Sequence, residues 1–242
     1  MDKLQLDQHI SRQFNVDLEH LRTNLLEMGG LVEQQVSDAV LAIETADSAL
    51  AEKVRETEQE VDQREIDLDH ECTLVLARRH PAASDLRMVL MVTKATRDLE
   101  RMGDEANKIA KMALALNEEG REPGRGYVEL RHLGANVIKM VNLSLDAFAR
   151  FDVASALKVV REDKDIDREY RSAMREMITY MMEDPRSISR VMNILWALRA
   201  LERIGDHARN IAEHVIYLVH GTDVRHISVS EMEEKIDGKK GK

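Results

Sequence analysis

Two pairs of carboxylates are the residues of this sequence with the clearest chemical potential. Glu100 and Asp104 form the first pair, and Glu202 and Asp206 form the second pair, 102 residues later. Residues four positions apart lie on one face of an α-helix, so each pair places two carboxylates side by side. Two like charges at this spacing repel each other, and a bound cation that prefers oxygen ligands removes the repulsion. The spacing therefore predicts two copies of one cation site.

Each pair lies within a longer repeated motif. The segments 97–110 and 199–212 are identical at nine of fourteen positions, and a glycine directly precedes the aspartate in both. Glycine inside a helix costs about 1 kcal/mol relative to alanine. Gly103 and Gly205 therefore indicate either close helix packing or room for a ligand. Repetition of the whole motif indicates that one structural module is used twice.

The preceding predicted helix carries a further acidic pair in each copy, again with a spacing of four: Glu58 with Asp62, and Asp163 with Asp167. If the two helices pack side by side, four carboxylates converge in each copy, which is enough oxygen for a polynuclear cluster. The apolar stripe of the motif helix marks its buried side and consists of Leu99, Met102, Ala106 and Ile109. Glu100 and Asp104 point roughly 130–170° away from it, which places the predicted site in a surface groove.

Ordinary helix-surface ion pairs are the alternative explanation for these carboxylates. Arg97 precedes Glu100 by three residues, and Lys108 follows Asp104 by four. Such spacings are typical of solvated charged faces. His207 and His214 lie on one helix face, and His207 aligns with an acidic residue of the first motif, so it is a further candidate for the second site.

The remaining sequence predicts an all-α protein of two tandem antiparallel three-helix bundles. Apolar residues recur at helical spacing, and no run alternates strictly. Asp47 and Asp152 are predicted helix N-caps, and the sequences His80-Pro81 and Asp184-Pro185 are predicted helix ends. The predicted helices cover 11–46, 48–79, 84–118, 127–151, 153–183 and 187–219. The predicted units are a first bundle at 1–118, a linker at 119–126, a second bundle at 127–221 and a flexible tail at 222–242.

Composition narrows the function class. Charged residues make up 33% of the chain, aromatic residues 3%, and the formal net charge is −10. That charge disfavours binding to nucleic acid or to an anionic lipid surface. The single cysteine, the absence of an N-terminal signal sequence and the short apolar runs predict a cytoplasmic protein without membrane insertion. Neither a glycine-rich nucleotide loop nor a repeated nucleophile–histidine–acid arrangement is present, so no enzyme activity is predicted.

The doubled motif L-E-R-[M/I]-G-D-x-A-x-x-I-A in an all-helical chain of this length resembles the PhoU family of phosphate-signalling regulators. The resemblance implies two tandem three-helix bundles and an accessory protein, often a homodimer, rather than an enzyme. It implies an adaptor between the ATPase subunit of a phosphate ABC transporter and a sensor histidine kinase. Such an adaptor restrains phosphate uptake and the phosphate-starvation response when phosphate is plentiful.

The resemblance also implies metal binding, because family members hold iron or zinc clusters, or magnesium or manganese, through E/D-x-x-x-D motifs. Carried over by position, the implied ligands are Glu100, Asp104, Glu202 and Asp206, with Glu58, Asp62, Asp163 and Asp167 on the neighbouring helices. Two alternatives stay open at this point. One is a metal-handling, iron-binding helical protein with no signalling role, and the other is a structural bundle whose acid pairs are solvated.

Overall fold

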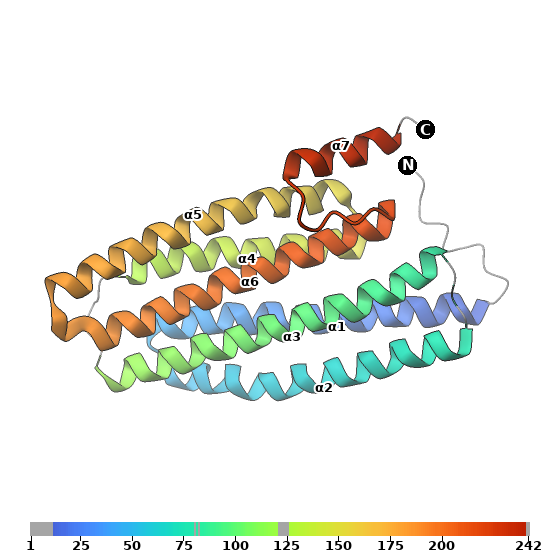
Figure 1. Cartoon of the computed structure of the whole chain (residues 1–242). Coiled ribbons are helices and arrows are strands. Elements are labelled where there is room, and N and C mark those ends of the chain that lie inside the picture. The colour runs from blue at the N-terminus through green and yellow to red at the C-terminus, as the bar shows by residue number, and fades with distance from the viewer. Residues whose placement is uncertain (1–11, 80, 82, 121–125, 241–242) are drawn as a thin grey trace.

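The structure, a computed structural model, describes residues 12–79, 81, 83–120 and 126–240, and its long helices run along a common axis in two layers (Figure 1). One layer contains α1 (Arg12–Thr45), α2 (Ser48–Arg79) and α3 (Ala83–Glu118). The other contains α4 (Tyr127–Arg150), α5 (Val153–Glu183) and α6 (Ile188–His220), with the short 3-10 helix η1 (Pro185–Ser187) between α5 and α6. The described residues contain no strand. The prediction of two tandem antiparallel three-helix bundles is confirmed.

The predicted helix boundaries agree with the described ones to within one residue. Asp47 and Asp152 cap helices as expected: the Leu50 N–H donates to Asp47 Oδ1 (3.0 Å), and the Ala154 N–H donates to Asp152 Oδ1 (3.0 Å). The predicted break at Asp184 is also present, where η1 begins with a proline. Ser11, His80 and positions 121–125 of the predicted linker lie outside the described residues.

The two bundles approach each other closely where α1 crosses α4. A Cβ atom on Gly29 would lie 2.7 Å from Leu145 Cδ2, and a Cβ atom on Gly134 would lie 2.8 Å from Val40 Cγ1. Gly134 follows Gly29 by 105 residues, and Leu145 follows Val40 by the same number. The same glycine-to-side-chain contact is therefore made twice, once from each repeat, around an approximate two-fold axis. Both glycines are needed because the helix backbones are too close for a side chain.

A buried polar cluster joins the bundles where α3 packs against α6. Asp98 on α3 is 8% exposed, and its carboxylate lies 2.9 Å from His207 Nδ1 and 2.9 Å from His214 Nε2. The Asn210 side-chain amide donates to Asp98 Oδ1 (3.0 Å). Burial alone would raise the pKa of Asp98, but these three hydrogen bonds hold it well below its usual range. The two histidines thus bind across the bundle interface and do not extend the second acidic site.

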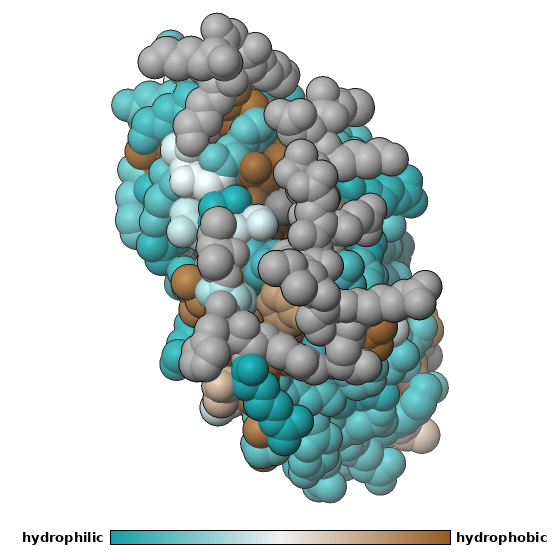
Figure 2. Space-filling view, turned by 90° about the vertical axis from the view of Figure 1, so that its right-hand side faces the viewer, coloured by the Kyte–Doolittle hydropathy of each residue, from teal (hydrophilic) through white to brown (hydrophobic). Residues whose placement is uncertain are grey.

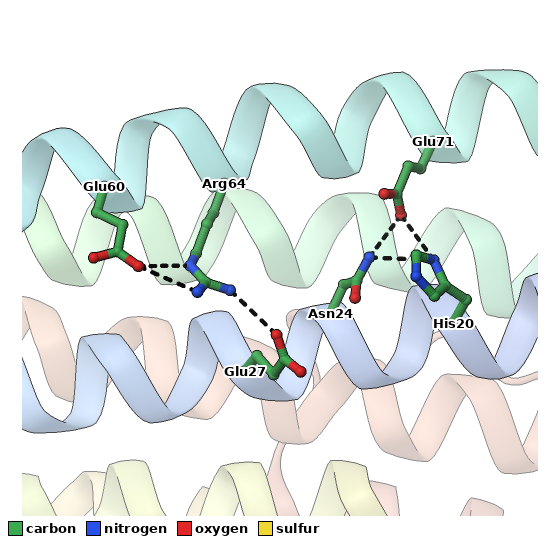
Figure 3. A network of polar contacts seen from close by, with 6 residues as sticks. All are labelled: His20, Asn24, Glu27, Glu60, Arg64 and Glu71. Carbon is green, nitrogen blue, oxygen red and sulfur yellow. Dashed lines mark hydrogen bonds and ion pairs between the residues drawn. The ribbon is translucent and has the colours of Figure 1, made fainter.

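Polar contacts between α1 and α2 lie on the surface of the first bundle (Figure 3). Arg64 forms ion pairs with Glu60 (3.1 Å) and Glu27 (3.5 Å), and Asn24 donates to Glu71 (2.9 Å). Exposed pairs of this kind contribute about 0–1 kcal/mol each. Stability therefore rests mainly on the apolar core between the helices, in which each of the six long helices buries one face.

Part of the predicted flexible tail forms a helix, α7 (Val229–Lys240), which lies along α5 (Figure 1). Ser228 and Glu231 form a capping box: the Ser228 N–H donates to Glu231 Oε2 (2.8 Å), and the Glu231 N–H donates to Ser228 Oγ (3.3 Å). Met232 and Ile236, one helical turn apart, are buried. This helix was not predicted, because the segment has no counterpart in the first repeat. The end of the molecule that Figure 2 shows is mainly hydrophilic, with small hydrophobic patches.

None of the described helices is both long enough and apolar enough to cross a bilayer.

The close crossing of α1 and α4 predicts opposite effects for two alanine substitutions. Gly134→Ala gains helix propensity but drives a methyl group into Val40, whose β-branched side chain is stiff, so we expect a net loss of about 1–2 kcal/mol in unfolding free energy. Gly30→Ala is the matched control, because its Cβ meets nothing within 4 Å, and we expect a gain of up to about 1 kcal/mol. Urea unfolding followed by circular dichroism measures both. Equal effects of the two substitutions would contradict the constraint.

Candidate functional site: two acidic clusters

The predicted carboxylates converge in both repeats because α2 packs against α3 and α5 packs against α6. The first acidic cluster consists of Glu58, Asp62, Glu100 and Asp104. The second acidic cluster consists of Asp163, Asp167, Glu202 and Asp206. In the first, the charges of the other three members all raise the pKa of Glu58. In the second, the charges of Asp206 and Asp167 raise the pKa of Asp163.

Glu58 is the buried member of the first acidic cluster and has no cationic partner among the described residues. Its side chain is 6% exposed, and Gln35 Nε2 donates to Glu58 Oε2 (2.6 Å). The other carboxylate oxygen, Oε1, is buried without a hydrogen-bond partner in the described part of the chain. Burial, reinforced by the neighbouring carboxylates, raises the pKa of Glu58 from 4.5 to about 7. An orphaned, buried carboxylate oxygen is the arrangement that a cation would complete.

Gly103 makes room for these polar groups. A Cβ atom on Gly103 would lie 3.0 Å from Gln35 Oε1 and 3.1 Å from Glu58 Oε2. Gly205, the matching glycine of the second repeat, would meet one atom within 4 Å, Ile166 Cγ2 at 3.4 Å. The two glycines of the repeated motif therefore differ: the first accommodates a carboxylate and an amide, and the second makes an ordinary helix packing contact.

An arginine enters the second acidic cluster and pairs with its buried aspartate, Asp163. Arg209 Nη1 donates to Asp163 Oδ2 (2.8 Å), and Arg209 Nε donates to Glu213 Oε1 (3.0 Å). Arg199 Nη1 donates to Glu202 Oε1 (2.6 Å). Burial raises the pKa of Asp163 to about 6 even though Arg209 opposes the shift. Asn107 stands in the first repeat where Arg209 stands in the second, so the first cluster lacks this counter-ion.

The carboxylates differ in exposure, and the prediction that Glu100 and Asp104 point away from the core agrees with their half-buried and exposed positions. Asp62, Asp104 and Asp206 are exposed, and Glu100 and Asp167 are half-buried. Glu58, Asp163 and Glu202 are buried. The single-helix stripe underestimates burial because α3 and α6 are each packed against several other helices. Among the described residues, no group of three or more His, Cys, Asp or Glu side chains is arranged to hold a metal ion as it stands.

A surface pocket of about 420 Å³ opens beside the first acidic cluster, between α2 and α3. Its lining consists of Glu65, Asp69, Thr93, Arg97, Glu100, Arg101 and Asp104. Burial, with the charges of Asp69 and Asp62, raises the pKa of Glu65, and burial with the charges of Glu65, Asp104 and Asp62 raises the pKa of Glu100. Glu65, Asp69 and Gln35 were not predicted as site residues, because the second repeat has Tyr170, Met174 and Met140 at the matching positions.

The burial of Glu58 predicts a stability that falls as pH rises. The native state binds the Glu58 proton more tightly than the unfolded state does, so ionisation costs nothing below about pH 4.5 and the cost develops fully by about pH 7. Removing the charge with Glu58→Gln should therefore raise the unfolding free energy at pH 8 by about 1–3 kcal/mol in the presence of a chelator, and should change it little at pH 4.5. Urea unfolding across this pH range measures the effect. Glu60→Gln, exposed on the same helix, is the control and should stay within about 0.5 kcal/mol of wild type; an equal response of both variants would refute the assignment.

Comparisons with known proteins agree with this architecture. A family model described as "PhoU domain" matches residues 25–113 and 130–215, one match in each repeat. The "Phosphate-specific transport system accessory protein PhoU homolog" of Pseudomonas aeruginosa is 60% identical over 241 residues, which cover 100% of this chain and 99% of that protein. The Escherichia coli K12 protein named "Phosphate-specific transport system accessory protein PhoU" is 44% identical, covering 99% of this chain and 98% of its own.

Solved structures show the same fold. The crystal structure of PhoU from Pseudomonas aeruginosa matches with a TM-score of 0.85 and 62% identity, covering 87% of this chain and 100% of that chain. The phosphate transport system regulatory protein PhoU from Streptococcus pneumoniae matches with a TM-score of 0.80 and 32% identity, covering 88% of this chain and 99% of that chain. The relatives are accessory or regulatory proteins and not enzymes. With a family match in both bundles and close relatives of full length, this chain belongs to the PhoU family.

Proposed function

We propose that this chain is a cytoplasmic accessory protein of phosphate uptake that restrains both uptake and the phosphate-starvation response when phosphate is plentiful. It acts as an adaptor between the ATPase subunit of a phosphate ABC transporter and a sensor histidine kinase, and it works as a homodimer. The observation that carries the proposal is the 60% identity, over essentially the whole of both chains, to a protein named as an accessory protein of phosphate-specific transport. Two packed bundles with an acidic surface suit a scaffold that contacts other proteins.

The adaptor role is tested by an affinity pull-down from phosphate-replete cells, with the full chain as bait and mass spectrometry of the captured proteins. We expect the transporter ATPase, the sensor kinase or both among the captured proteins. Deletion of the gene provides the second readout and should raise alkaline phosphatase expression in high phosphate. Unchanged phosphatase expression in high phosphate would overturn the regulatory role.

We further propose that the first acidic cluster binds a metal ion. Carboxylate oxygens suit magnesium and manganese, and iron or zinc are the other candidates. Glu58, Asp62, Glu100 and Asp104 would hold the ion after small side-chain rotations, and the unpaired Oε1 of Glu58 supports the fit. The ion would supply positive charge that neutralises the cluster and fixes α2 against α3. Asp163, Asp167, Glu202 and Asp206 are the weaker site, because Arg209 already neutralises Asp163.

Metal binding predicts thermal stabilisation that depends on the first acidic cluster. A ligand that binds only the native state adds about 2.7 kcal/mol at one hundred times its Kd. Manganese or magnesium should therefore raise the melting temperature at pH 8, and the double variant Glu100→Gln/Asp104→Asn should lose most of that rise. The double variant Glu202→Gln/Asp206→Asn is the matched control and should keep most of it. A melting temperature that does not respond to any of the four metals would instead indicate a bundle with solvated carboxylates.

The alternative of a metal-handling protein with no signalling role has its own readout. Such a protein would oxidise added Fe(II) faster than buffer does. When used as the bait in the pull-down, it would contain stoichiometric metal and would capture neither the transporter ATPase nor the sensor kinase. The described residues place no histidine in the first acidic cluster, whose members are all Asp or Glu, whereas di-iron helical bundles use an E-x-x-H arrangement. We therefore expect iron oxidation at the buffer rate.

A further inference from the structure

The pocket beside the first acidic cluster brings cationic and anionic side chains together. Arg97 and Arg101 line it from α3, where they alternate along the helix with Glu100 and Asp104. Its volume of about 420 Å³ is within the range of small-ligand sites, roughly 300–1,000 Å³. On an ordinary salt-bridged surface, each guanidinium group contacts a carboxylate, and the side chains of this pocket are arranged differently.

The two pocket arginines lack partners that their counterparts in the second repeat have. Among the described residues, neither Arg97 nor Arg101 makes an ion pair or a side-chain hydrogen bond. Their counterparts are engaged: Arg199 donates to Glu202 (2.6 Å) and lies over the Tyr170 ring, and Arg203 Nη1 lies 2.9 Å from Glu105 Oε1. The same motif therefore holds its guanidinium groups in the second repeat and leaves them available in the first.

The acidic side chains that α2 contributes to the pocket are specific to the first repeat. Glu65 and Asp69 on α2 contribute carboxylates to it, and the matching residues on α5 are Tyr170 and Met174. The second repeat thus fills the equivalent space with an aromatic ring and a thioether. The first repeat therefore keeps unpaired arginines beside the carboxylates of Glu65 and Asp69, whereas the second repeat pairs its arginines and lacks those two carboxylates.

The chemistry of the lining selects a ligand that combines a cation with an anion. An anion alone would meet the carboxylates of Glu65, Asp69 and Glu100, which repel it. A cation alone would leave both guanidinium groups unpaired. A divalent cation that carries a tetrahedral oxyanion satisfies both sets, because magnesium commonly binds one or two carboxylates together with phosphate oxygens, and arginine forks bind phosphate in a bidentate manner.

We propose that this pocket binds phosphate, or the phosphoryl group of a larger molecule, as a complex with a divalent cation. Glu100 and Asp104 hold the cation, which also contacts the buried Glu58 beside Gly103, and Arg97 and Arg101 hold the oxyanion. The inference rests on the metal site proposed above and goes beyond it, because it makes the site a joint sensor of cation and phosphate. Arg97 and Arg101 are thus required for binding the oxyanion, which the carboxylates alone would repel.

The experiment is isothermal titration calorimetry on the full chain at pH 8, with magnesium alone, inorganic phosphate alone, and phosphate after saturation with magnesium. We expect weak or no phosphate binding without magnesium, and binding with magnesium present. Linkage requires phosphate to tighten magnesium binding by the same factor, on the order of 5–150-fold for typical coupling. A parallel titration with ATP and magnesium distinguishes free phosphate from a nucleotide phosphoryl group as the source.

Two double variants separate this inference from the metal site. Arg97→Gln/Arg101→Gln should keep magnesium binding in the absence of phosphate and lose the mutual tightening. Arg199→Gln/Arg203→Gln is the matched control from the second repeat and should keep both; its melting curve shows whether it folds. Magnesium binding that phosphate and ATP leave unchanged would overturn the inference and leave the metal site standing. No binding of magnesium, nor of manganese, iron or zinc in the same titration, would overturn the metal site and this inference with it. Phosphate binding of equal strength without magnesium, or in Arg97→Gln/Arg101→Gln, would show an unrelated site and would also overturn this inference.

Discussion

The packing of α3 against α6 joins the two bundles, and the buried carboxylate of Asp98 specifies the register of that packing. One ionised group accepts hydrogen bonds from two histidines and an asparagine of the opposite repeat, so a shift of one helical turn would leave several buried polar groups without partners. Because α3 and α6 also carry the repeated motif, their register sets where the two acidic clusters lie relative to each other. The glycine contacts of α1 and α4 close the other side of the same interface.

The two nearly identical motifs stabilise their buried carboxylates in different ways. In the second repeat, Arg209 enters the cluster and binds Asp163, so the chain itself supplies a counter-charge to that buried carboxylate. In the first repeat, asparagine stands at that position, and the buried Glu58 is stabilised by an amide hydrogen bond alone. Burying an ionised carboxylate without a cation is costly, so the first repeat is the less stable one electrostatically at neutral pH. The two repeats therefore share the same helices, but their acidic clusters differ.

The helical periodicity, the aspartate caps and the repeat were sufficient to predict the six long helices and their tandem arrangement. They were sufficient because each signal is local in sequence or shared by both copies. The roles of Asp98, Gln35 and Glu65 could not be predicted, because each of these residues occurs in one repeat alone. The matching residues in the second repeat are Ala200, Met140 and Tyr170. Burial of Glu202 escaped prediction because it depends on the neighbours of α6, which a single-helix projection does not include.

Asymmetry between the copies agrees with the proposed ligand site in the first repeat. A site that the chain neutralises internally has the same free energy whether or not a ligand is present, and it can transmit nothing. A site that keeps a buried carboxylate unpaired has a lower free energy when a cation arrives, and this difference is available to shift the packing of α2 on α3. In the proposed site, Glu58 in the core and Arg97 and Arg101 at the surface are therefore the residues through which a bound ligand would change the energy of the fold.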